Sequence, residues 1–243
     1  MINDYKILAI TLARGGSKTI PKKNIIDICG KPLLQYTTDE VKKSKYIDSY
    51  FVSTDDNTIW DTCNKLKTNV VKRPKELATD KATSADALMD AVERVEETEG
   101  KFNYIIEIMC TNPLKTVEDI DGCIEKLNEA MLNTDRGNGP IDYASVVSVV
   151  QLYDHHPSRI KYIDKDTGVL TDFYPEVPES RRQDLTPEAY IRNGSIYAMT
   201  KRYLFDNKAR YKKDTYPYIM PEERTINIDS KADLLMAEIL LKK

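Results

Sequence analysis

The sequence predicts a three-layer α/β/α fold in which helices cover both faces of a mostly parallel β-sheet. Short apolar runs, which are typical of buried strands, alternate with longer amphipathic segments of helical period. This alternation favours βαβ units, because parallel neighbours in a sheet are joined by a crossover that is usually a helix. At 243 residues, the chain is long enough to bury one substantial core without disulfides or metals.

The elements follow from these patterns in chain order. Strands are predicted for the apolar runs at residues 7–12, 50–53, 104–109 and 144–150. Helices are predicted for the amphipathic segments at residues 31–44, 56–66, 84–97, 117–132 and 231–241. Residues 152–190 break the alternation with Pro, Asp and charge. We therefore expect one α/β domain, formed by residues 1–151 and 191–243, and a small excursion over residues 152–190.

Composition narrows the class of protein. The net charge of −3 does not favour a nucleic-acid partner, so anion binding has to be local. The four cysteines are widely spaced, which favours free thiols in a reducing cytoplasm over a disulfide framework or a zinc site. The sequence has no signal-peptide pattern and no apolar stretch of transmembrane length. A cytoplasmic protein without a membrane partner is therefore expected.

The stretch after the first predicted strand is the most distinctive part of the sequence. Residues 11–26 contain no acid. Four cations fall in the same stretch: Arg14, Lys18, Lys22 and Lys23. Gly15 and Gly16 let the backbone turn and bring N–H groups close to a ligand, and the cations neutralise phosphate. The spacing fits neither a P-loop nor a dinucleotide-binding glycine motif. We expect a nucleoside triphosphate here, and a basic exposed turn is the alternative.

The pattern Arg14-Gly-Gly-Ser-Lys-x-Ile-Pro-x-Lys-Asn24 resembles the N-terminal signature of the CMP-sialic acid synthetase family. These cytidylyltransferases activate acidic sugars with CTP. The resemblance implies a Rossmann-like sheet of the nucleotidyltransferase type, Mg²⁺ as cofactor and a homodimer formed through the excursion. It also implies nucleotide-binding roles for Ala13, Arg14, Gly15, Gly16, Ser17, Lys23 and Asn24.

A second motif runs from Arg73-Pro-x-Glu-Leu-Ala to Asp-x-Ala-Thr-Ser84. In the resembled family this stretch holds the nucleotide. The resemblance implies that Arg73 lies near the phosphates or the base, and that Ala82 and Ser84 lie near the cytosine and the ribose. The alternative interpretation is a capped helix start, because Thr and Ser are preferred capping residues.

The sugar-binding residues are implied by the resemblance alone. They are Met109, Arg182, Gln183, Asn193, Gly194 and Tyr197. Met109 replaces a glutamine that contacts the acidic sugar in sialic acid synthetases, and a thioether does not supply the same hydrogen bond. Arg182 and its neighbour Arg181 suit a carboxylate, because a guanidinium offers two parallel donors, although surface ion pairs are the alternative. The identity of the sugar therefore stays open.

Near the end of the chain, Asn227 and Asp229 alternate with isoleucines. On a strand, both polar side chains would face the same side, where two oxygen ligands suit Mg²⁺. The resembled family has Asp-Ile-Asp at this place and links both carboxylates with the metal; Asn227 replaces the first. Alternatively, Asp229 and Ser230 cap the final helix.

The resemblance extends over about residues 7–238 and implies one reaction. CTP and an acidic 2-keto sugar would give a CMP-sugar and pyrophosphate, with Arg14, Lys23 and Asp229 as the catalytic residues. Sialic, legionaminic and pseudaminic acids are the expected sugars, and a Kdo-type sugar or a phosphonate is the alternative acceptor. The alternative outside the enzymes is a catalytically altered relative that binds nucleotide as a regulatory subunit. Turnover with any sugar distinguishes the two classes.

Overall fold

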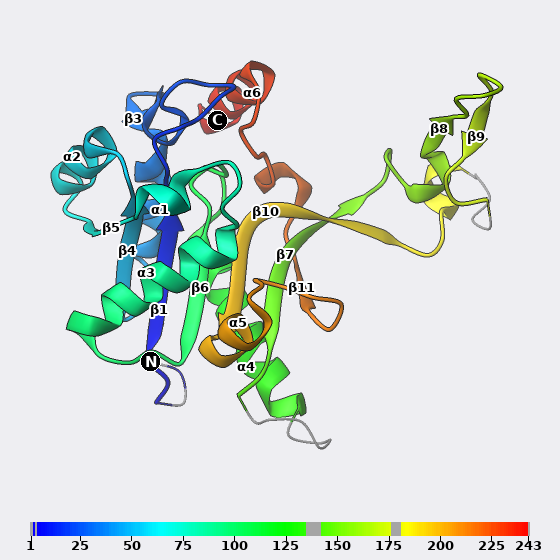
Figure 1. Cartoon of the computed structure of the whole chain (residues 1–243). Helices are drawn as coiled ribbons and strands as arrows, with labels where there is room; N and C mark the ends of the chain where they lie inside the picture. Colours follow the sequence, from blue (N-terminus) through cyan, green and yellow to red (C-terminus); the bar gives the residue numbers. More distant parts are fainter. Residues whose placement is uncertain (1, 3, 135–141, 176–180, 243) are drawn as a thin grey trace.

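The computed structural model describes residues 2, 4–134, 142–175 and 181–242. Within these residues, seven strands form one sheet in the order β11-β7-β10-β6-β1-β4-β5 (Figure 1). They are β1 (Ile7–Leu12), β4 (Ser49–Thr54), β5 (Asn69–Lys72), β6 (Tyr104–Ile108), β7 (Ser145–Leu152), β10 (Ala189–Thr200) and β11 (Tyr216–Ile219). β10 runs antiparallel to β6 and β7, and the other pairs are parallel.

Helices cover both faces of the sheet, which confirms the predicted three-layer α/β/α fold. One face carries α1 (Leu33–Val41), α2 (Asn57–Lys65) and α4 (Val117–Thr134). The other face carries α3 (Ser84–Glu99) and α5 (Lys201–Asn207). The last helix, α6 (Lys231–Leu241), lies at the end of the sheet toward which β1 points (Figure 1). Within the described residues, no helix is long and apolar enough to span a membrane.

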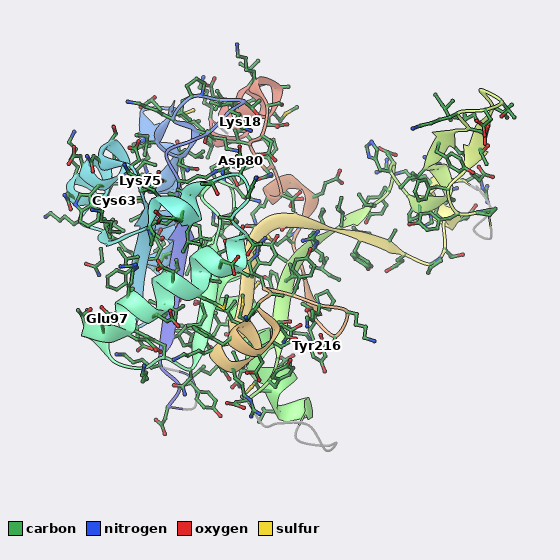
Figure 2. The ribbon with its side chains drawn as sticks, in the orientation of Figure 1. Lys18, Cys63, Lys75, Asp80, Glu97 and Tyr216 are labelled. Carbon is green, nitrogen blue, oxygen red and sulfur yellow. The ribbon has the colours of Figure 1, made fainter. Side chains whose placement is uncertain are left out.

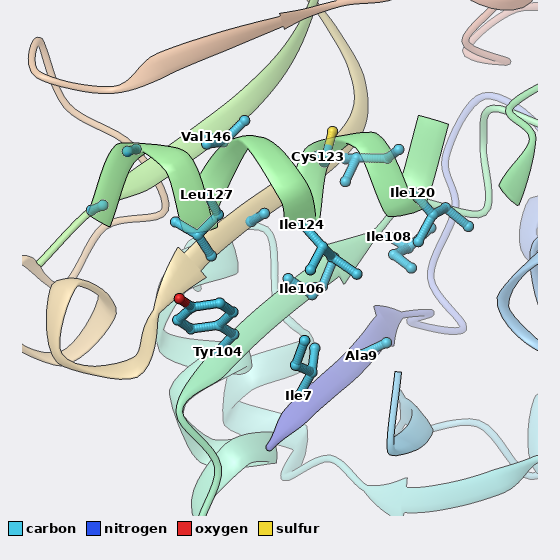
Figure 3. Close-up of a cluster of buried hydrophobic side chains, with 14 of the residues drawn as sticks. Ile7, Ala9, Tyr104, Ile106, Ile108, Ile120, Cys123, Ile124, Leu127 and Val146 are labelled. Atoms are coloured by element: carbon cyan, nitrogen blue, oxygen red, sulfur yellow. The ribbon is translucent and has the colours of Figure 1, made fainter. Parts of the chain in front are cut away.

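The two central strands are buried on both faces. Figure 3 shows α4 over the sheet, with Ile120, Ile124 and Leu127 directed at β1 and β6. Because strand side chains alternate, Leu8 and Ile105 face the opposite core, under α3. Burial on both faces explains the continuous apolar runs of these strands. It also fixes the point at which the chain leaves the carboxyl end of β1.

Three strands of the sheet were not predicted from the sequence. β5 and β11 are only four residues long, and β10 carries Arg192, Asn193 and Gly194 in its interior. Conversely, the strand expected through Asn227 and Asp229 is not formed. That segment instead docks on the loop after β6, where the Ile228 N–H donates to the Thr111 carbonyl oxygen at 2.8 Å.

The excursion leaves the sheet as a two-stranded ribbon. β7 and β10 stay paired as far as Leu152 and Ala189. Beyond them lies a hairpin of β8 (Lys161–Ile163) and β9 (Leu170–Asp172), which Figure 1 shows well apart from the core. Large apolar side chains are exposed on and beside this hairpin: Tyr162, Ile163, Val169, Leu170, Phe173 and Tyr174.

The packing of α4 generates the first prediction. Leu127→Ala removes a fully buried side chain and should lower the free energy of unfolding by about 2–5 kcal/mol. Leu132→Ala on the same helix is the matched control, because Leu132 is 61% exposed; its effect should stay within about 0.5 kcal/mol. Urea denaturation measures both variants. Equal losses in the two variants would contradict the assigned face of α4.

Candidate active site

The chain leaves β1 through a turn at Gly15. The Gly15 N–H donates to Asp55 Oδ1 at 3.0 Å, and a Cβ at Gly15 would lie 2.7 Å from the Cβ of Asp56. Glycine permits this close approach without a shift of Asp56. Further along the loop, Asn24 Nδ2 donates to the Arg14 carbonyl oxygen at 3.0 Å. Hydrogen bonds from both ends therefore fix the loop after β1.

The basic side chains of this loop gather on two acids. Arg14 Nη2 and Lys18 Nζ lie 3.0 and 2.5 Å from the two carboxylate oxygens of Asp80, and they lower the pKa of that carboxyl. Lys23 Nζ lies 2.8 Å from Asp229 Oδ1, which comes from the far end of the chain. Figure 2 shows Lys18 and Asp80 close together above the sheet. Both acids are more than half exposed, so an incoming phosphate can replace either carboxylate.

Two adjoining cavities open around the end of β1. The first has a volume of about 370 Å³, and its lining includes Ser17, Lys18, Lys23 and Asn24. The second has a volume of about 260 Å³, and its lining includes Arg73, Ala82, Ser84 and Glu107. Both cavities share Leu12, Arg14 and Met109. The structure thus brings together, around two adjoining cavities, predicted residues from three separate stretches of the sequence.

Three residues predicted in the loop line neither cavity formed by the described residues: Ala13, Gly15, whose N–H is bonded to Asp55, and Gly16. Ala13 is fully buried in a core cluster with Leu34 and Val52, so it supports the loop from below. Gly16 is exposed, and no atom of the described residues outside its neighbours would lie within 4 Å of a Cβ there. The requirement for glycine therefore falls on Gly15.

Arg73 is held rigidly at the wall of the second cavity. It is buried, and its guanidinium donates to Ser53 through Nε to Oγ at 3.2 Å and through Nη2 to the carbonyl oxygen at 2.9 Å. Burial lowers the pKa of Arg73, and the carboxylates of Asp55 and Glu107 oppose this shift. The guanidinium therefore presents a fixed positive charge beside the cavity.

The start of α3 agrees with both interpretations of the second motif, a capped helix start and a wall of the cavity. Thr83 caps the helix, because its side chain accepts from the Asp86 N–H at 3.1 Å. Its neighbours Ala82 and Ser84 line the second cavity. The capped helix start is real, and it also directs these two residues at the space beside Arg73.

Lys115 fixes the loop after β6, which carries Met109. Its buried ammonium donates to Thr37 Oγ1 at 2.8 Å and to the carbonyl oxygens of Met109 at 2.8 Å and Asn112 at 2.5 Å. Three acceptors match the three donors of an ammonium. Burial lowers the pKa of Lys115 to about 7. Lys115 could not be predicted as a buried site residue, because a lysine in a loop ordinarily faces solvent.

Three acids of the site were not predicted from the sequence. Asp56, after β4, caps α2 by accepting from the Ile59 N–H at 3.0 Å. Its neighbour Asp55 instead accepts from the glycine turn. Asp80 belongs to the second motif, but no role was predicted for it, and Glu107 gave no local signal, because both acids pair with cations distant in the chain.

Asn227 and Asp229 lie together, as the alternation predicted, although not on a strand. Asn227 Nδ2 donates to Asp229 Oδ2 at 2.5 Å. Ser230 caps α6, because its side chain accepts from the Asp233 N–H. The Asp229 carboxylate therefore does not cap this helix. One carboxylate and one amide oxygen fit Mg²⁺ as a partial set, because this ion takes its other ligands from water and phosphates. Within the described residues, no group of three or more His, Cys, Asp or Glu forms a complete protein cage.

The predicted sugar residues fall into two groups. On β10, Asn193 and Tyr197 are buried; Asn193 Oδ1 accepts from Ser148 Oγ at 2.6 Å, and the Tyr197 ring lies 4.2 Å from the Arg210 guanidinium. Between them Gly194 has a φ of +65°, and a Cβ there would lie 3.9 Å from Asn227. Gly194 therefore adjoins the pair formed by Asn227 and Asp229.

Arg182 and Gln183 lie elsewhere. They line a separate cavity of about 360 Å³ in the excursion, together with Tyr153 and His156. The Arg182 guanidinium lies 5.0 Å from the centre of the Tyr153 ring. A single chain does not bring these two residues to the cavities around β1.

A glycine turn and a set of cations lie at the carboxyl end of a central parallel strand, the edge at which open α/β sheets bind ligands. The sequence profile of the cytidylyltransferases matches residues 8–223. The chain therefore belongs to the cytidylyltransferase family.

Individual relatives agree with this assignment, and a solved structure shares the fold. An N-acylneuraminate cytidylyltransferase of Streptococcus agalactiae is 31% identical over 95% of this chain and 52% of its own length. A pseudaminic acid cytidylyltransferase of Campylobacter jejuni is 28% identical over 98% of this chain and 97% of its own length. The chain thus spans about half the length of the first relative. The solved CMP:2-keto-3-deoxy-manno-octonic acid synthetase complexed with CTP shares the fold, with a TM-score of 0.69, 16% identity and 98% of both chains covered.

The geometry of the turn generates the second prediction. Gly15→Ala forces a Cβ against Asp56 and should lower the free energy of unfolding by about 1–3 kcal/mol. Gly16→Ala places its Cβ in open space and should be neutral or stabilising by up to about 1 kcal/mol. Urea denaturation of the pair measures the difference. Identical stability of the two variants would show that the turn does not require glycine at residue 15.

Proposed function

We propose that this chain transfers CMP from CTP to an acidic 2-keto sugar and releases pyrophosphate. One observation carries the proposal: in a member of the cytidylyltransferase family, Arg14, Lys18 and Lys23 surround a cavity at the end of β1. The relatives named above act on N-acylneuraminate and pseudaminic acid, and a third, from Legionella pneumophila, is a CMP-N,N′-diacetyllegionaminic acid synthase. A nonulosonic acid of this kind is therefore the proposed acceptor.

In this proposal the first cavity takes the triphosphate. Arg14, Lys18 and Lys23 exchange their carboxylate partners for phosphate oxygens. The second cavity takes the nucleoside, beside Arg73 and the start of α3. Because Arg14 lines both cavities, its guanidinium lies where the α-phosphate would join the two parts of the nucleotide.

The reaction needs charge stabilisation more than covalent help from the protein. The anomeric hydroxyl of the sugar attacks the α-phosphorus of CTP and loses its proton to water, a P–O bond forms, and the bond to the β-phosphate breaks, so that pyrophosphate leaves. Arg14 and Lys23 stabilise the charge that gathers on the phosphate oxygens, and fixed positions reduce the entropy cost of the attack. Asp229, with Asn227, is the proposed holder of Mg²⁺, which neutralises phosphate charge when it is bound. Lys23 contacts the same carboxylate and so links the loop to this pair.

The sugar is proposed to lie beside Met109 and Gly194. Arg182 and Gln183 would reach the sugar of a partner's site in a homodimer, because they are remote from the cavities of their own chain. Exposed apolar side chains on the β8–β9 hairpin support such a contact. The free thiols of Cys29, Cys63, Cys110 and Cys123 support a cytoplasmic location.

Pyrophosphate release with CTP tests the proposal across a panel of sialic, legionaminic, pseudaminic and Kdo-type acids and a phosphonate. Turnover with at least one nonulosonic acid is expected. Binding of CTP without turnover for any acceptor would instead favour a regulatory nucleotide-binding subunit. Turnover only with a Kdo-type acid or a phosphonate would correct the acceptor while retaining the reaction type.

Arg14→Ala removes the cation shared by the two cavities. It should retain the fold, as judged by circular dichroism, and lower kcat/KM by about 10²–10³-fold. Lys22→Ala is the matched control, because Lys22 belongs to the same loop and lines neither of the two cavities formed by the described residues. Its turnover should stay close to that of the wild type. Equal activity of the two variants would refute the role of Arg14.

Removal of Mg²⁺ with a chelator should abolish pyrophosphate release. Asp229→Asn weakens the electrostatic attraction of the site and should raise the half-saturating Mg²⁺ concentration by about 10-fold or more. Asp61→Asn, which changes an exposed acid on α2, serves as the control. An unchanged Mg²⁺ requirement in Asp229→Asn would remove this residue from the metal site.

A further inference from the structure

Glu107 is a fully buried acid in the middle of the sheet, on β6. Its Oε2 accepts from Arg210 Nη1 at 2.7 Å. Its Oε1 has no hydrogen-bond partner among the described residues. Buried carboxylate oxygens are nearly always hydrogen-bonded, because an unpaired one has lost its hydration without compensation. The unpaired oxygen therefore points to a partner that the chain itself does not supply.

The unpaired oxygen belongs to a residue that lines the second cavity. Glu107 shares that lining with Arg73, Ser84 and Met109. Glu107 lies on β6, Met109 follows the end of that strand, and both side chains line this cavity. A molecule that occupies the cavity beside Met109 therefore lies next to Glu107.

Glu107 is held in a defined orientation. The Arg210 guanidinium binds one of its oxygens and lies 4.2 Å from the centre of the Tyr197 ring. Tyr197 in turn is the direct cross-strand neighbour of Glu107 in the β6–β10 pair. Burial raises the pKa of Glu107, whereas Arg210 and Arg73 lower it. The carboxylate is thus anchored through one oxygen, and the other is left for the cavity.

We propose that Glu107 is a specificity-determining residue whose Oε1 accepts a hydrogen bond from an N–H or O–H group of a bound substrate. This inference rests on the proposed function. A carboxylate only accepts hydrogen bonds, so a substrate oxygen without a proton at this position is rejected and a donor is selected. Two substrates offer such donors: the 4-amino group of cytosine, and the hydroxyl or amide groups of the acidic sugar. Uracil carries a carbonyl oxygen where cytosine carries the amine, so the two sources are separable.

Glu107→Gln is the direct test. Its amide oxygen keeps the contact with Arg210, and its NH₂ then replaces the acceptor in the cavity by a donor. If Glu107 binds cytosine, the affinity ratio of CTP to UTP, measured by calorimetry, should fall by about 10-fold or more. If Glu107 binds the sugar, that ratio stays fixed and the relative kcat/KM values among the accepted acids change by about 10-fold or more.

A matched control separates selectivity from the loss of a buried acid. Glu96 is also a buried carboxylate, but both of its oxygens are bonded, to Phe102 N and to the ammonium groups of Lys101 and Lys201. It lies on α3, outside the lining of the second cavity as the described residues form it. Glu96→Gln should leave both selectivity ratios unchanged.

A second variant covers the case in which Glu107→Gln does not fold. Glu107→Leu with Arg210→Met replaces the buried pair by apolar side chains of similar size, an exchange that proteins often tolerate. It also removes the acceptor, so the same ratio should change as in Glu107→Gln. If the folded variant keeps both the CTP-to-UTP ratio and the acceptor ratios of the wild type, Glu107 does not determine specificity.

The wild-type protein reports separately on the proposed function. Turnover of the wild type with unchanged ratios in the variants overturns only the role of Glu107. A wild type that neither binds CTP nor releases pyrophosphate overturns the proposed function and the role of Glu107 together.

Discussion

Burial of β1 on both faces is the constraint on which the site depends. With α3 and α4 packed against opposite faces, the carboxyl end of this strand has no freedom to move. The chain leaves it at Gly15, whose backbone lies against Asp55 and Asp56 at the end of β4. The turn then presents its cations at the edge where ligands of open α/β sheets bind. The contact of Lys23 with Asp229 joins this edge to the far end of the chain.

Much of the fold could be predicted because hydrophobic periodicity reports burial directly. β1, β6, α3 and α4 have long or largely apolar patterns and lie where the sequence placed them. β10 could not be found in this way, because Arg192, Asn193 and Gly194 interrupt its pattern and only pairing with β6 and β7 makes it a strand. The segment around Asn227 was wrongly predicted as a strand for the opposite reason. Its alternation is that of a strand, but no neighbouring edge pairs with it within the described residues.

The residues of the candidate site likewise divide into those that a local motif marks and those that only the fold brings together. The basic loop after β1, Arg73 and the start of α3 have local signatures, and they line two adjoining cavities. Glu107 and Lys115 have none, because their partners lie 103 and 78 residues away in the chain, at Arg210 and Thr37. Long-range pairs of this kind depend on the completed fold. Motifs therefore located the cavities, and the structure added the charged groups that hold and shape them.

The central claim is that the turn after β1 binds the triphosphate of a cytidine nucleotide. Calorimetric titration of the wild-type protein with CTP and with cytidine, in the same magnesium buffer, tests it most directly. CTP should bind at least about 100-fold more tightly than cytidine, because only CTP meets the cations of the loop, and this preference should shrink with added salt. Equal affinities for the two compounds, or no binding of CTP, would contradict the claim.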